Sequence, residues 1–325
     1  MSKRTRLPVN GRSLGELAMR AARTSGSAAW RNAPFPLRAP TVPNGVTPLR
    51  PKAKLGADYD TEWARSYPAR LARVLMVEGL VRPAMDILAA PKVDGLDRLH
   101  DLDGAVIFAA NHHSHVDTPL LLATIPEPWQ HHLAIAAGAD YFFGNRLTAP
   151  LSALAIGAIP IERNKVNRKS ADDAAALLDE GWSLLIFPEG GRSPDGWGQT
   201  FRPGAAYLAL RCGVPVVPIH LEGTGDILRK GRTFPKPGRT TITFGAPLRP
   251  TDGEDSRSFA TRIQATVEQL ADETTTDWYS ARKRAHAGVT PSLVGPEAVG
   301  AWRRTWQLGA NTPKRARQQR SWPKL

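Results

Sequence analysis

Short apolar runs alternate with helix-length segments along the centre of the chain. The runs are five to eight residues long, as expected for buried strands, and occupy residues 105–110, 132–136, 158–162, 183–187, 214–221 and 240–244. The helical segments lie between and after them, at residues 118–124, 147–156, 204–212 and 256–274. Strands that alternate with helices predict an α/β fold, with a mostly parallel central sheet covered by helices on both faces.

Two further helices are indicated by their boundary residues and spacing. Ser170 followed by Asp173 resembles a capping box, which predicts the start of a helix that ends before Gly181. Upstream, residues 61–89 carry apolar side chains near helical spacing with arginines between them, and Pro83 is predicted to kink or divide this helix. The amphipathic pattern fits a helix at a membrane interface and a helix packed on the domain equally well.

Composition divides the chain into three parts. Residues 1–58 are rich in Pro, Arg, Ala and Ser without sustained periodicity, which predicts a largely disordered segment. They hold 11 basic and 2 acidic residues, and residues 282–325 hold 10 basic and 1 acidic residue. Residues 59–281 hold 22 basic and 27 acidic residues. We therefore expect one mildly acidic central domain between two basic tails.

Basic tails suit an anionic membrane surface or nucleic acid, although solvated tails that bind nothing have the same composition. Trp302, Trp306 and Trp322 favour the membrane, because indole rings prefer the headgroup region. The central part lacks any motif in which basic and aromatic residues combine as they do in RNA-binding modules. We expect no nucleic acid partner.

Cysteine use and hydropathy exclude several classes of protein. A single cysteine, Cys212, cannot form an internal disulfide or a cysteine-based zinc cluster, and its small neighbours predict a buried structural thiol. The basic start lacks the apolar core of a secretory signal, and there is no run of about 18 uncharged apolar residues that would span a bilayer. We expect a cytoplasmic protein whose contact with a membrane is peripheral.

The first candidate motif follows the apolar run 105–110 and reads NHHSHVD from Asn111 to Asp117. A histidine near neutral pH can remove a proton from a hydroxyl, and a carboxylate on its other ring nitrogen fixes the tautomer. His112 is expected at the carboxyl end of a strand, where open α/β sheets place their sites, and Asp117 at the start of the next helix. The pair is a candidate general base and its orienting carboxylate.

Three other interpretations of this motif remain open on its residues alone. Asp117 is also a good helix N-cap. Three histidines and an aspartate within six residues could bind a metal. The same letters match the pattern of condensation domains and wax ester synthases, in which His113 would be the base, although Thr118 stands where those proteins usually have glycine.

The second candidate motif follows the apolar run 183–187 and reads FPEGGR, with Glu189, Gly190 and Arg192. Glycines in a turn let the backbone approach a phosphate closely. An arginine binds phosphate through charge-assisted, bidentate hydrogen bonds, whereas a glutamate accepts a bond from a hydroxyl or positions an arginine.

Together, in this order, the two motifs resemble the glycerolipid acyltransferase superfamily, typified by lysophosphatidic acid acyltransferases. Residues 156–163, which end in Arg163, are similar to its second sequence block, and residues 214–219 to its fourth. Gly191 stands where the family commonly has threonine or serine. The resemblance covers roughly residues 104–250.

The resemblance implies an O-acyltransferase of phospholipid biosynthesis. It implies that His112 and Asp117 are catalytic and that Arg163, Glu189, Gly190 and Arg192 bind a phosphorylated acceptor such as 1-acylglycerol-3-phosphate. The co-substrate would be acyl-CoA or acyl-carrier protein, with no metal or other cofactor. The protein would act on the inner face of the cell membrane. There are two alternatives. The protein could be an acyltransferase that acts on another lipid or glycolipid acceptor, or an inactive membrane-binding module of the same fold.

Overall fold

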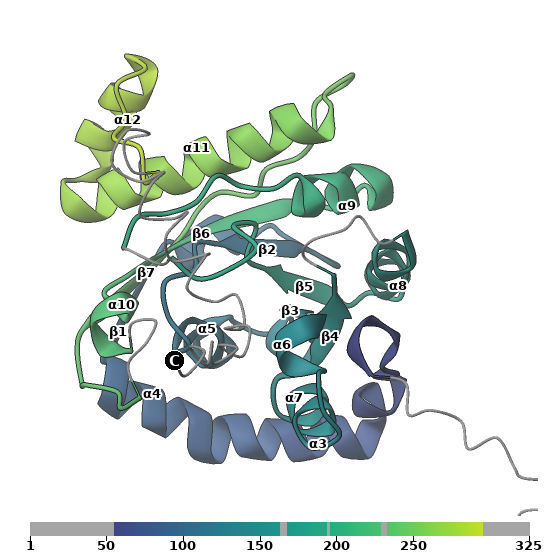
Figure 1. Ribbon diagram of the computed structural model, residues 1–325. Coiled ribbons are helices and arrows are strands. Elements are labelled where there is room, and N and C mark those ends of the chain that lie inside the picture. The colour runs from purple at the N-terminus through teal and green to yellow at the C-terminus, as the bar shows by residue number, and fades with distance from the viewer. Residues whose placement is uncertain (1–54, 163–167, 194–195, 229–232, 295–325) are drawn as a thin grey trace, which may run out of the picture. The chain divides into compact units, whose positions relative to one another are not determined.

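The computed structural model describes residues 55–162, 168–193, 196–228 and 233–294 (Figure 1). Within these residues, seven strands form one sheet in the spatial order β1-β7-β6-β2-β5-β3-β4. The strands are β1 (Pro91–Asp94), β2 (Ile107–Ala110), β3 (Leu133–Gly138), β4 (Ala158–Ile161), β5 (Ser183–Ile186), β6 (Val216–Glu222) and β7 (Thr240–Phe244). The pair β6 and β7 is antiparallel and the other neighbouring pairs are parallel, which confirms the predicted mostly parallel sheet.

Helices precede, separate and follow the strands. The α-helices of the described residues are α3 (Tyr67–Met76), α4 (Arg82–Ala89), α5 (Asp117–Thr124), α6 (Ala139–Phe142), α7 (Thr148–Ile156), α8 (Arg168–Asp179), α9 (Gly204–Cys212), α10 (Thr224–Ile227), α11 (Ser256–Thr275) and α12 (Trp278–His286). The shorter elements are the 3-10 helices η1 (Gly56–Asp58), η2 (Glu62–Arg65), η4 (Leu96–Leu99) and η5 (Gln130–His132), and the π-helical turn η3 (Val77–Val81).

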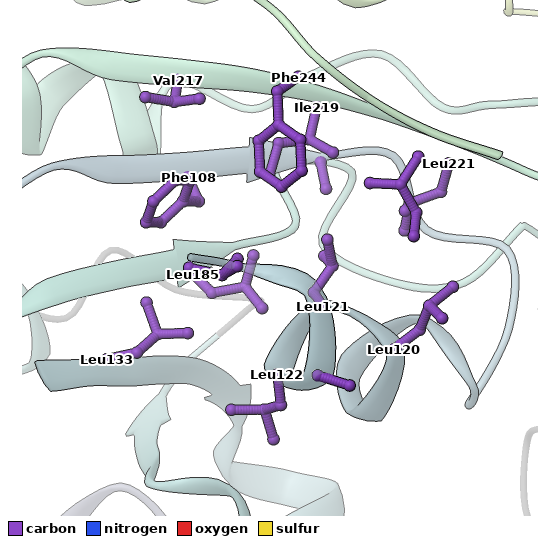
Figure 2. Close-up of a cluster of buried hydrophobic side chains, with 14 of the residues drawn as sticks. Phe108, Leu120, Leu121, Leu122, Leu133, Leu185, Val217, Ile219, Leu221 and Phe244 are labelled. Atoms are coloured by element: carbon purple, nitrogen blue, oxygen red, sulfur yellow. The ribbon is translucent and has the colours of Figure 1, made fainter. Parts of the chain in front are cut away.

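Successive side chains of the central strands pack into two hydrophobic clusters, one on each face of the sheet. On β2, Phe108 belongs to a cluster completed by α4 and α5, and Ile107 to a cluster completed by α8, α9 and α11. Figure 1 shows the two groups of helices on opposite sides of the sheet. In the first cluster, Leu121 of α5 lies against Leu185 and Phe244 of the strands (Figure 2). Burial on both faces explains why these strands are continuous apolar runs.

The predicted helix at residues 61–89 begins at Tyr67 and continues to Ala89, so Pro83 does not divide it. Pro83 lies in the first turn of α4, directly after the π-helical turn η3. A proline has no backbone N–H and its ring crowds the carbonyl four residues earlier. The wider turn accommodates both effects, as π-bulges commonly do within helices.

Three other sequence-based expectations differ from the structure. Helix α8 already includes Arg168, so Ser170 lies inside the helix, buried, and does not cap it. Strand β1, at the edge of the sheet, was not predicted, because its residues, Pro91–Asp94, include a lysine and an aspartate and form no apolar run. The predicted domain boundary between residues 281 and 282 falls within α12.

Some expectations fall outside the described residues. These are residues 1–54 of the segment 1–58 that was predicted to be disordered, and the interfacial role of Trp302, Trp306 and Trp322. For residues 55–58 the prediction of disorder is wrong, because they include η1 and the backbone N–H of Gly56 donates to the Phe143 carbonyl. In the ranges that are described, the helices lack the combined length and apolar character needed to cross a bilayer.

Candidate active site

The two sequence motifs meet at the carboxyl ends of two neighbouring parallel strands. Strand β2 leads into Asn111–Asp117 and strand β5 into the FPEGGR turn. The backbone N–H of His112 donates to Glu189 Oε1 at 2.8 Å, and the backbone N–H of Ser193 donates to the His112 carbonyl at 2.9 Å. Parallel strands end at the same edge of a sheet, which is why segments 77 residues apart can bond to each other.

His112 and Asp117 form a buried pair. Nδ1 of His112 donates to Oδ2 of Asp117 at 2.8 Å, and the Asp117 side chain is fully buried whereas that of His112 is 17 % exposed. The imidazole stacks on Phe187 with ring centroids 4.1 Å apart. Because Nδ1 is held by the carboxylate, Nε2 is the ring nitrogen that can accept a proton from a substrate.

Asp117 also organises the loop that carries His112. Its Oδ2 accepts the backbone N–H groups of His113 at 2.7 Å and Ser114 at 2.8 Å. Helix α5 begins at Asp117, and the carboxylate makes no capping bond to the helix amides. The N-cap interpretation of Asp117 is therefore wrong.

The other two histidines of the motif lie against different neighbours. His113 is half-buried, its Nε2 is shielded from solvent without a hydrogen-bond partner, and burial lowers its pKa. His115 stacks on Tyr141, and its pKa is lowered by burial and by the nearby charge of Arg192. The carboxylate of Asp117 bonds to the ring of His112, whereas His113 reaches it through its backbone. This geometry favours His112 over His113 as the base.

Glu189 connects the loop that carries His112 to the loop that contains Gln199. It is 1 % exposed, and its second carboxylate oxygen, Oε2, accepts the backbone N–H of Gln199 at 2.9 Å. Gly190 follows with a φ of +73°, and a Cβ there would lie 2.8 Å from Nε of Arg202. The positive φ is what favours glycine here, since the flexible Arg202 side chain could shift to admit a Cβ. Sequence reasoning expected Glu189 to meet an acceptor hydroxyl or an arginine and did not foresee its bonds to two backbone amides.

The two predicted phosphate-binding arginines have different outcomes. Arg192 is half-buried, and the residue that follows it, Ser193, donates its backbone N–H to the His112 carbonyl. The backbone of Arg192 therefore lies next to the loop that carries His112. Arg163 falls outside the described residues.

Two further hypotheses from the sequence concern a metal site in the histidine motif and the role of Cys212. Across the described ranges, His, Cys, Asp and Glu side chains do not gather in groups of three or more that could hold a metal ion. Cys212, at the end of α9, was predicted to be buried and is half-buried, and this burial raises the pKa of its thiol. A raised thiol pKa disfavours the thiolate that a nucleophile would need.

Two residues that hold the site were not assigned a role from the sequence. Asn111 clamps the loop to β6, since Nδ2 donates to the Leu221 carbonyl at 2.9 Å and Oδ1 accepts the Leu221 N–H at 2.7 Å. Gln199 binds Glu189 through its backbone. The signal for Asn111 was a polar residue placed directly after an apolar strand, whereas nothing in the sequence marks Gln199.

Comparison with known proteins gives a consistent result. The model of the acyltransferase family matches residues 90–222. The chloroplastic 1-acyl-sn-glycerol-3-phosphate acyltransferase of Brassica napus is 32 % identical over 149 residues, which cover 43 % of this chain and 39 % of that protein. The alpha form from sheep is 28 % identical over 178 residues, covering 53 % and 59 %. The chain thus spans about two fifths of the length of the plant relative.

The fold has a counterpart among solved structures. The 1-acyl-sn-glycerophosphate acyltransferase of Thermotoga maritima superimposes with a TM-score of 0.53 at 24 % identity, over 67 % of this chain and 84 % of that one. This likeness extends the agreement from the sequence motifs to the arrangement of strands and helices.

Proposed function

We propose that this chain, whose residues 90–222 match the model of the acyltransferase family, transfers a fatty acyl group to the hydroxyl of a lysophospholipid. The acceptor of this proposal is 1-acylglycerol-3-phosphate or a similar phosphorylated lipid. The donor is acyl-CoA or acyl-carrier protein, and no further cofactor takes part. The reaction serves phospholipid biosynthesis.

The 2.8 Å hydrogen bond between His112 and the buried carboxylate of Asp117 carries the proposal. Nε2 of His112 removes the proton of the acceptor hydroxyl as its oxygen attacks the thioester carbonyl. The resulting tetrahedral intermediate expels the thiolate, which takes the proton back from the imidazolium. Asp117 holds the tautomer and stabilises the imidazolium throughout.

The acceptor phosphate is assigned to the arginines of the FPEGGR turn and of residues 156–163. Arg192 directly precedes Ser193, whose backbone N–H donates to the His112 carbonyl, so a phosphate bound by Arg192 would lie close to the base. Arg163 joins it on the ground of the sequence motif alone. Gly190 lets the backbone pass closely, and Glu189 fixes the turn against the His112 backbone.

Purified protein with palmitoyl-CoA and a panel of lysolipid and glycolipid acceptors tests this proposal. Thiol release that depends on 1-acylglycerol-3-phosphate is expected, together with formation of the diacyl product. Faster transfer to an uncharged glycolipid would replace the acceptor, and the role of Arg192 with it. Absence of thiol release with every acceptor would favour the alternative, a membrane-binding module that keeps the fold without the activity.

We also propose that the protein works at the cytoplasmic face of the cell membrane, bound peripherally. The basic segments 1–58 and 282–325 flank the central domain of residues 59–281, and each basic residue near an anionic surface contributes about 1 kcal/mol before screening. Sedimentation with anionic vesicles, weakening as salt rises, is expected of the full chain. Residues 55–294 alone, which retain α12, should lose the salt-dependent part. Equal binding by the two proteins would remove the tails from the proposal.

A further inference from the structure

The end of the described chain returns to the loop that follows the FPEGGR turn. After α12 the chain turns and runs beside Gly198, whose backbone N–H donates to the Leu293 carbonyl at 2.9 Å. Gly198 and Val294 form an isolated parallel bridge. The contact is close, since a Cβ on Gly198 would lie 3.3 Å from the Leu293 carbonyl oxygen. Residues 290–294 are called the C-terminal strap below.

Helix α11 anchors both the strap and the loop. Oε1 of Glu268 accepts the Ser292 hydroxyl at 2.8 Å and the Leu293 N–H at 3.2 Å. The same oxygen accepts Nε2 of Gln264 at 3.1 Å, and Oε1 of Gln264 accepts the Phe201 N–H at 2.9 Å. One pair of side chains on α11 therefore holds the loop on one side and the strap on the other.

The loop connects the strap to the base. Gln199, the residue after Gly198, donates its backbone N–H to Glu189 Oε2, and its side-chain Nε2 donates to the Gly191 carbonyl at 3.2 Å. The other oxygen of Glu189 accepts the backbone N–H of His112. A displacement of the strap would thus reach the backbone of His112 through one buried carboxylate.

We propose that the C-terminal strap is a positioning element of the active site and that Glu268 is its positioning residue. The strap holds residues 198–201 in place, and these residues bind the carboxylate of Glu189. Glu189 in turn binds the backbone N–H of His112 and so holds His112 at the carboxyl end of β2. The strap lies outside residues 90–222, where the family model matches. The inference rests on the proposed acyl transfer for its effect on rate, but its structural step stands independently.

The size of the effect follows from the sensitivity of catalysis to position. A misplacement of about 1 Å can cost about 10²-fold in rate. Loss of Glu268 loosens the strap rather than removing it, because Leu293 also packs against the hydrophobic cluster beneath α11. We therefore expect kcat to fall about tenfold in Glu268→Ala, with the KM for the acyl donor unchanged.

The test compares Glu268→Ala with a matched variant, Glu273→Ala, in the full chain. Glu273 lies on the same helix and bonds to Arg98, so its loss removes a partly buried ion pair without touching the strap. Both variants are expected to unfold at lower temperature, but Glu273→Ala should keep the wild-type kcat. Glu268→Gln, which retains an acceptor oxygen, should restore most of the lost rate.

Amide hydrogen exchange provides a readout that does not depend on activity. In Glu268→Ala, exchange is expected to accelerate in residues 196–201 and at His112, and to stay unchanged in β4. Unchanged exchange at both places overturns the connection, and faster exchange with an unchanged kcat overturns the positioning role. A wild-type protein that transfers no acyl group, with faster exchange in the variant, overturns the proposed function and leaves the strap supported.

Discussion

At the residue scale, one carboxylate oxygen accepts three hydrogen bonds within the candidate catalytic motif. Oδ2 of Asp117 accepts the ring of His112 and two backbone amides, so the orientation of the base and the shape of its loop depend on the same atom. His113 stands beside it in sequence, but its Nε2 is buried without a hydrogen-bond partner. Two neighbouring histidines thus differ in chemistry because their surroundings differ: the ring of His112 is bonded to a carboxylate, and that of His113 is not.

Replacement of His112 by alanine should lower kcat by about 10²–10⁴-fold, the usual contribution of a general base, and leave acyl-CoA binding intact. His113→Ala should be milder, because it removes packing and no proton acceptor that faces the substrate. Steady-state kinetics with calorimetric titration of acyl-CoA separates the two effects. Equal losses, or a loss confined to His113→Ala, would support the condensation-type pattern instead.

Arg192→Ala should raise the KM for a phosphorylated acceptor by an amount that corresponds to about 2–3 kcal/mol, the cost of a lost charged hydrogen bond. The KM for the acyl donor should stay the same. Kinetics with lysophosphatidic acid and with monoacylglycerol provide the comparison, since the second lacks the phosphate. If lysophosphatidic acid is used equally well by the variant, Arg192 does not bind the acceptor.

At the element scale, the helical segment from Tyr67 to Ala89 presents an exposed apolar stripe. Its members are Tyr67, Leu71, Leu75, Leu80 and Ile87, of which Tyr67 is 77 % and Ile87 80 % exposed. The spacing is four residues up to Leu75 and five across the π-helical turn η3. The wider turn keeps the stripe on one side of the helix. Exposed apolar residues in a continuous row suit an interface with lipid.

Leu71→Ser combined with Leu75→Ser should weaken binding to vesicles by about tenfold or more, because burial of a leucine side chain contributes about 1.5–3 kcal/mol. The loss should persist at high salt, unlike the contribution of basic residues. Tyr279→Ser, on α12, serves as the control, since Tyr279 is also exposed but lies beside α11 on the opposite face of the sheet. Unchanged binding by the double variant would exclude the helix as an anchor.

At the scale of the whole molecule, stability depends on keeping a buried histidine neutral. Burial, with a smaller effect from His113, lowers the pKa of His220 on β6 to about 3. In the unfolded chain the same group titrates near 6.5. As the pH falls below about 6.5, His220 becomes protonated in the unfolded chain but stays neutral in the folded protein. Folding is therefore weakened progressively between about pH 6.5 and pH 3.

For His220 alone, the loss between pH 7 and pH 5 is about 2 kcal/mol. His220→Gln removes the titration, so the variant should lose about 2 kcal/mol less over this interval. Urea unfolding at the two pH values measures the difference. Thr243, which is buried opposite His220 on β7 and does not titrate, provides the control, because Thr243→Val should leave the pH dependence unchanged. An unaltered pH dependence in His220→Gln would mean that other groups carry it.

The local pattern was sufficient for most strands and helices. Helix α9 and strand β7 begin and end where the apolar pattern predicted, because their boundary residues are strong signals. Capping was less reliable: Ser170 has the right neighbours for an N-cap, yet α8 extends past it. A capping box indicates that a helix can start at a given residue. Tertiary packing determines whether the helix starts earlier.

The sequence by itself determined the α/β class, the order of the central strands and of the helices between them, and the pairing of His112 with Asp117, because each depends on residues close together in the chain. Tertiary structure alone decided the bonds that join distant segments. Glu189 meets His112 and Gln199 because β2 and β5 are neighbours in the sheet, and Glu268 meets Ser292 because the chain turns back after α12. Such contacts follow from strand order and chain return, which no local pattern of side chains specifies.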